Sequence, residues 1–114
     1  MGAMGGAGLD PSSARRRSGQ RVFQEWLSTP VQSPRQMRQE FQLKLYFAQR
    51  ESQELWAHLL DLQRTACQHW LTNQQSLAGE AGEAHSYAWL VEQYRIGQIQ
   101  AMLDWLEFCA THQV

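Results

Sequence analysis

The sequence predicts an all-α protein: a long antiparallel helical hairpin, coiled-coil-like, with a short N-terminal accessory helix, which completes a bundle by association. Apolar residues recur every three or four positions from 37 to 66 and again from 86 onward. A stretch at about 75–85 that contains glycines has no such period and predicts the reversal of the chain. The 114 residues are 43% hydrophobic and include five tryptophans, which is enough for one folded domain.

Residues 1–19 are rich in glycine, serine and arginine and have no apolar period. This composition is typical of a flexible tail, and we expect no fold there. The helical domain is expected to cover residues 20–114.

A short helix is predicted at about 20–28, where apolar residues fall on one face of two helical turns. So short a helix is not stable alone, and it must dock on the rest of the protein. The predicted docking segment consists of Val22, Phe23, Trp26 and Leu27.

A long helix is predicted at about 34–74. Ser33 is placed as N-cap, Pro34 at the first helical position and Gln36 at the third, which completes a capping box. The apolar stripe that follows is broken only at Ser52. Such a helix would be about 60 Å long against about 40 Å for its mate, so residues 37–47 are expected to lack a partner.

The predicted C-terminal helix, about 86–112, has apolar residues on two opposite sides. The first stripe is Tyr87, Val91, Tyr94, Ala101, Trp105 and Phe108. The second stripe is Trp89, Ile96, Ile99, Leu103, Leu106 and Ala110. A helix that is apolar nearly all round is a buried helix, and one antiparallel neighbour covers only one side. We therefore expect self-association or a partner subunit.

Charge is divided unevenly along the chain. Residues 1–50 carry eight Arg or Lys side chains against three acids, and residues 51–114 carry two against eight. The two parts therefore have net charges of about +5 and −6, which favours an acidic partner or charge matching between copies. Cys67 and Cys109 are interpreted as core residues, because the hairpin would place them roughly 22 Å apart, too far for a disulfide.

The sequence predicts no enzyme, catalytic residue, metal site, cofactor or small-molecule substrate. No two histidines have the i, i+4 spacing of helical metal ligands, and phosphate-loop and nucleophile-elbow motifs are absent. No apolar run reaches the length of a membrane span, and the N-terminus lacks the apolar core of a secretory signal. We therefore expect a soluble intracellular protein, cytoplasmic or nuclear.

The stretch STPVQSP, residues 28–34, is interpreted first as a stiff elbow in which one proline ends a helix and the next begins one. Thr29 and Ser33 also match proline-directed kinase sites, and Ser18 follows three arginines as in basophilic sites. Our hypothesis is that phosphorylation here regulates docking of the short helix.

These patterns favour a non-enzymatic protein–protein interaction or scaffold subunit of a homo- or hetero-oligomeric complex, bound to another helical protein or to itself. The expected interface anchors are Phe41, Tyr46, Phe47, Trp56, Trp70, Trp89, Ile96, Leu103, Trp105 and Leu106. The alternative is an amphipathic helical binder of a lipid or membrane surface or of nucleic acid, acting through the basic N-terminal half.

Overall fold

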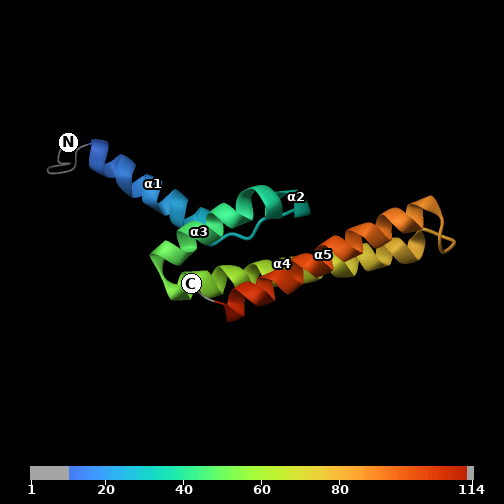
Figure 1. The fold of residues 1–114 in the computed structure, drawn as a ribbon. Coiled ribbons are helices and arrows are strands. Elements are labelled where there is room, and N and C mark those ends of the chain that lie inside the picture. Colours follow the sequence, from blue (N-terminus) through green and yellow to red (C-terminus); the bar gives the residue numbers. More distant parts are fainter. Residues whose placement is uncertain (1–10, 113–114) are drawn as a thin grey trace.

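The protein is described here by a computed structural model that covers residues 11–112, with side chains from Gly19 onward. Within these residues every regular element is helical, which confirms the all-α class (Figure 1). The elements are α1 (Pro11–Leu27), α2 (Pro34–Gln36), the π-helical turn η1 (Met37–Phe41), α3 (Gln42–Glu51), α4 (Gln53–Glu80) and α5 (Tyr87–Thr111). The molecule is elongated, 70 × 33 × 18 Å.

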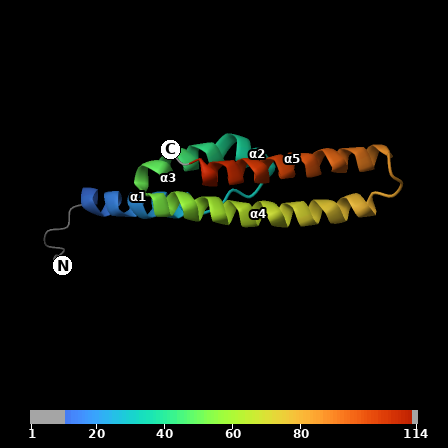
Figure 2. The same cartoon turned by 60° about the horizontal axis from the view of Figure 1, so that its bottom comes forward.

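α4 and α5 pack against each other along their length (Figures 1 and 2). Leu59 and Cys67 from α4 meet Ile99 and Leu106 from α5 in the buried core. α4 continues to Glu80, beyond the predicted end at about 74, because Ala78 and Glu80 are good helix formers. The connection turns at Gly82, whose φ of +90° is a conformation that favours glycine.

The predicted single helix over 34–74 is interrupted at Ser52. This residue is extended, with φ of −169°, and its hydroxyl accepts a hydrogen bond from the amide of Leu55 at 3.0 Å. A serine that caps a new helix ends the previous one, so α3 folds back beside α4 and η1 reaches α5 (Figures 1 and 2). The end at 37–47 therefore does have a mate within the chain: Phe41 is fully buried, with its ring 6.0 Å from that of Trp105.

α1 begins at Pro11, so helix covers residues 11–19, where the composition predicted no fold. Proline suits the first position of a helix, and alanine and arginine are good helix formers. α1 docks on α3 through aromatic rings: Phe23 lies 5.5 Å and Trp26 lies 6.4 Å from Phe47.

The elbow, residues 28–34, is fastened to the helices by two buried polar side chains. The amide of Val31 donates to Oε1 of Gln63 at 2.7 Å, and Nε2 of Gln63 donates back to the carbonyl of Val31 at 3.1 Å. Nζ of Lys44 donates to the carbonyls of Trp26 and Thr29, at 2.8 and 2.5 Å. Residues 28–34 are therefore part of the packed structure and not a free linker.

Candidate interaction surfaces

The largest apolar surface of α5 faces away from α4. We call it the outward face of α5; it consists of Tyr87, Leu90, Tyr94, Gly97, Ala101, Trp105 and Phe108. These residues follow one another at three or four positions and so form one stripe. Tyr87 is 81% exposed, Tyr94 68%, Phe108 57%, Leu90 52% and Trp105 37%.

The two predicted stripes of this helix differ in environment. From the second stripe Ile99 and Leu106 are buried against α4, while Ile96, Leu103 and Trp89 are partly buried. From the first stripe Tyr87, Tyr94 and Phe108 remain largely in water. One hairpin mate thus covers one side of α5.

The outward face carries almost no charge. Three of the four charged residues of α5 are paired away from this face. Glu92 pairs with Arg95 at 3.4 Å and with Gln74, and Glu107 lies 3.7 Å from Arg64 of α4. Asp104, at the edge of the face, is in no ion pair among the described residues. Contact with another apolar surface would therefore strip water from few charges.

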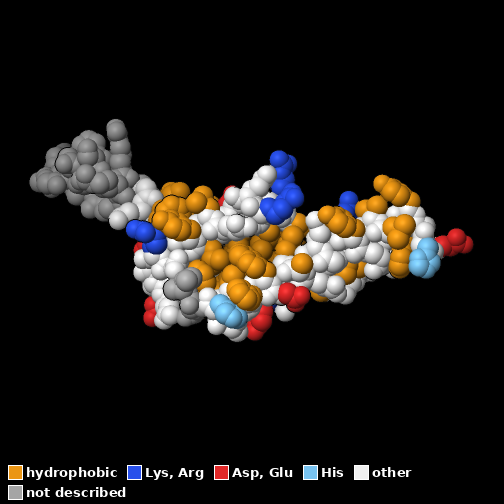
Figure 3. All heavy atoms as spheres, in the orientation of Figure 1, with side chains coloured by type: hydrophobic (Ala, Val, Ile, Leu, Met, Phe, Trp, Pro, Cys, Tyr) orange, Lys and Arg blue, Asp and Glu red, His pale blue; other side chains and the backbone are white. Residues whose placement is uncertain are grey.

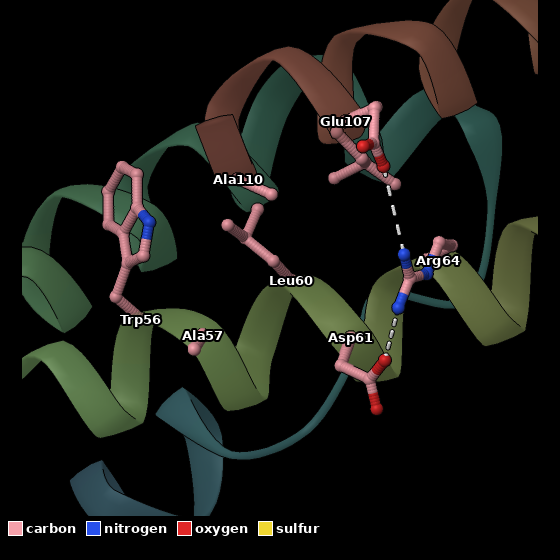
Figure 4. A pocket seen from close by; sticks show the side chains of 8 residues that line it. Trp56, Ala57, Leu60, Asp61, Arg64, Glu107 and Ala110 are labelled. Atoms are coloured by element: carbon pink, nitrogen blue, oxygen red, sulfur yellow. Dashed lines mark hydrogen bonds and ion pairs between the residues drawn. The ribbon is translucent and has the colours of Figure 1, made fainter. Parts of the chain in front are cut away.

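A pocket of about 300 Å³ lies between the C-terminal part of α5 and the first half of α4 (Figure 4). Trp56 stands at one end and Arg64, paired with Asp61 and Glu107, at the other, with Leu60 and Ala110 between them (Figure 4). The indole nitrogen of Trp56 is buried and has no hydrogen-bond partner. A side chain that is mostly apolar but carries a hydrogen-bond acceptor for the indole nitrogen of Trp56 would fit this pocket.

Aromatic residues also gather where α1 crosses α3. Phe23 and Trp26 stack on each other and both meet Phe47 edge-to-face, as does Tyr46. Tyr46 is half exposed, with the guanidinium of Arg50 over its ring. Most of this cluster is used to hold α1.

Basic side chains converge beside α2, where Figure 3 shows them projecting from the surface. Arg35 and Arg38 share a cleft of about 270 Å³ with Arg95 of α5, floored by Ile99 and Met102. Three arginines around one cleft favour an anionic group.

The predicted anchors and docking residues are divided between the core and the surface. Leu27, Phe41, Trp56 and Leu106 are buried inside the chain. Phe23, Trp26, Phe47, Trp70, Trp89, Ile96 and Leu103 are partly buried. Val22, Tyr46 and Trp105 are exposed. Sequence reasoning missed Leu90, although its position between Tyr87 and Tyr94 on one face was a signal.

The predicted phosphorylation sites have different surroundings. Ser33 is partly buried and caps α2 by accepting from the amide of Gln36 at 3.3 Å. The side chain of Gln36 reaches the amide of Gln32, not that of Ser33, so the capping box closes one residue early. Thr29 is exposed and donates to the carbonyl of Glu25, and the side chain of Ser18 lies outside the described residues.

Both cysteines are buried free thiols. Burial raises the pKa of Cys67 to about 11 and also raises the pKa of Cys109, so both are held as neutral thiols. Among the side chains described, from residue 19 to 112, no three of His, Cys, Asp or Glu form a cluster that could hold a metal ion.

Comparisons with protein-family models, with curated proteins and with solved structures gave no match. Of the helices that the structure describes, none has the length and apolar character required to cross a membrane.

Proposed function

We propose that this protein is a non-enzymatic interaction subunit whose coiled-coil-like hairpin completes a larger helical bundle in a homo- or hetero-oligomer. The observation that carries the proposal is the outward face of α5, which is apolar, continuous and exposed. Exposed apolar patches of this size on small proteins mark interaction sites. Trp105, on this face, is the anchor we expect a partner to contact.

The size of the driving force supports association. If each aromatic residue has about 200 Å² of surface, the five large side chains of the face expose about 600 Å². Covering that area is worth up to about 15 kcal/mol at about 25 cal/mol per Å². Association costs about 4–15 kcal/mol in lost motion, so the upper value of the gain matches the upper value of that cost.

Light scattering on the purified chain, alone and after incubation with cell extract, tests the proposal. Leu90→Arg should abolish any assembly larger than one chain, because it places a charge within the covered face. Leu43→Arg is the matched control, because Leu43 on α3 is 51% exposed and lies outside the face. A compact monomer under both conditions, unchanged by either substitution, would contradict the proposal.

A second candidate function, binding of an anionic surface or nucleic acid, rests on the cleft of Arg35, Arg38 and Arg95. Such binding depends on counterion release and weakens steeply as salt is raised. Titration of anionic vesicles and of duplex DNA at two salt concentrations tests it, with Arg38→Glu as the variant that should lose binding. Assembly through the outward face of α5 should depend little on salt, so the two functions separate.

A further inference from the structure

We infer that the occupant of the outward face of α5 is the α5 helix of a second copy, packed antiparallel about a two-fold axis near residue 99. This inference rests on the proposed function, since it names the partner for the same face. The argument comes from the order of side-chain sizes along the face, from one carboxylate and from the shape of the molecule.

Two pairs of residues on the face match in size about residue 99, whereas the positions mirrored from Tyr94 and Trp105 are Asp104 and Gln93. Leu90 and Phe108 lie nine residues on either side, and the small residues Gly97 and Ala101 lie two residues on either side. An antiparallel pair centred there sets Leu90 against Phe108 of the second copy and Gly97 against Ala101 of the second copy. A Cβ built at Gly97 meets no atom within 4 Å, so the helix surface is open at the point where two axes would approach most closely.

Asp104 favours the antiparallel over the parallel arrangement. In a parallel pair in register, Asp104 would face Asp104 of the second copy, and two carboxylates brought together out of water repel each other. In the antiparallel pair Asp104 shares a layer with Tyr94 of the second copy, because the two residues lie five positions on either side of 99. The phenol oxygen of Tyr94 accepts from Gln98 at 3.2 Å, which leaves its own proton free to donate to that carboxylate.

The shape of the molecule agrees with this choice. η1 lies beside the C-terminal half of α5, where Phe41 meets Trp105, and the cleft of Arg35 and Arg38 reaches back to Arg95. The turns of α5 before Arg95 have only α4 next to them among the described residues (Figures 1 and 2). Antiparallel pairing places the two-helix end of each copy, α4 and α5, against the end of the other copy that also contains η1 and α3. Parallel pairing would bring together the two ends that contain η1 and α3.

The area is adequate for a dimer. The exposed parts of the five large side chains give about 600 Å² per copy, and Gly97, Ala101 and the bordering glutamines add to it. A stable interface typically covers about 800 Å² per partner. A second copy also brings the same nearly uncharged surface, so little charge is buried.

Gly97→Leu tests the close approach at the axis. A side chain at this position meets open space in the single chain and improves helix propensity, so the fold should be kept or stabilised. The dimer should nevertheless weaken, with its dissociation constant raised by at least about tenfold in sedimentation or light scattering. Gly79→Leu is the control: Gly79 is also helical and open, but lies on α4, and the dimer should be unchanged.

Cross-linking tests the direction. Chains carrying Leu90→Cys mixed with chains carrying Phe108→Cys should form disulfide-linked pairs on oxidation, while each variant alone should not. The wild-type chain is the background control, since Cys67 and Cys109 are buried. Cross-linking of Leu90→Cys with itself would overturn the antiparallel arrangement, because residues 90 of the two copies would lie roughly 27 Å apart along the axis.

One outcome separates this inference from the proposed function. A wild-type chain that stays monomeric at high concentration overturns the homodimer. If that monomer still forms a complex in extract that Leu90→Arg abolishes and Leu43→Arg does not, the proposed function stands with a different occupant. If no complex forms, both fail.

Discussion

Replacing Gln63 by leucine should release the elbow at a cost that the structure allows us to work out. Gln63 is fully buried and holds both polar backbone groups of Val31, which is itself 2% exposed. Leucine leaves that amide and that carbonyl buried without partners, at about 1–3 kcal/mol each. The added apolar burial returns about 1–2 kcal/mol, so the middle of these ranges gives a net loss of about 2.5 kcal/mol.

Urea denaturation followed by far-ultraviolet circular dichroism measures this loss as a midpoint lower by about 1–2 M, at a slope of about 2 kcal/mol per M. Gln68→Leu, on the exposed side of the same helix, is the control and should leave the midpoint nearly unchanged. Hydrogen exchange at the amide of Val31 should accelerate in the Gln63 variant alone. Equal midpoints for the two variants would refute the reasoning.

Gln63→Glu tests the same contact through the pH dependence of the free energy of unfolding. A protonated carboxyl can both accept from and donate to Val31, whereas a carboxylate can only accept and is buried as a charge. The folded-state pKa of the new carboxyl should therefore be raised above the unfolded value of about 4.3. The stability of this variant should be nearly normal below that pH and fall as pH rises through the folded pKa, while that of Gln63→Leu should show no such change.

Three further predictions follow from other buried contacts. Lys44→Met should cost about 1.5–3 kcal/mol, because it leaves the carbonyls of Trp26 and Thr29 without their charged donor, and should speed hydrogen exchange in residues 20–29. Stability should fall between pH 9.0 and about 11, because the unfolded chain loses the Cys67 proton before the folded chain does. Cys67→Ala should lessen this fall. Lys44 contributes a rise in stability over alkaline pH, because burial lowers its pKa in the folded chain. Ser33→Ala should lower the free energy of unfolding by about 1 kcal/mol through loss of the cap on α2, whereas Ser33→Asp should keep it. Partner affinity unchanged by both variants would contradict regulation at this site.

At Ser52 the sequence shows a residue that can end one helix and cap the next, but it does not show how the two helices then pack. The break in the apolar stripe was apparent, and serine is a good N-cap. Whether a helix continues through one serine or turns back there depends on what each arrangement buries. Folding back lets Phe41 leave water against Trp105, a gain made by residues 64 positions apart and not visible in any local window.

The polar anchors of the elbow were not predicted for a similar reason. Glutamines are numerous in this chain, and nothing in the neighbours of Gln63 distinguishes it from the exposed Gln68. Its role comes from the position of Val31, which reaches it only after the chain has reversed at 28–34. Lys44 likewise looks like a surface cation until α1 lies across α3.

The sequence alone determined the helical class, the cap at Ser33 and the excess of apolar surface on the C-terminal helix, because these depend on residue type and on spacing within a few turns. The tertiary structure decided which apolar stripe meets α4, which aromatic residues are core and which polar side chains hold the elbow. Those outcomes depend on the total area that competing arrangements remove from water, and that sum exists only once distant segments are placed side by side.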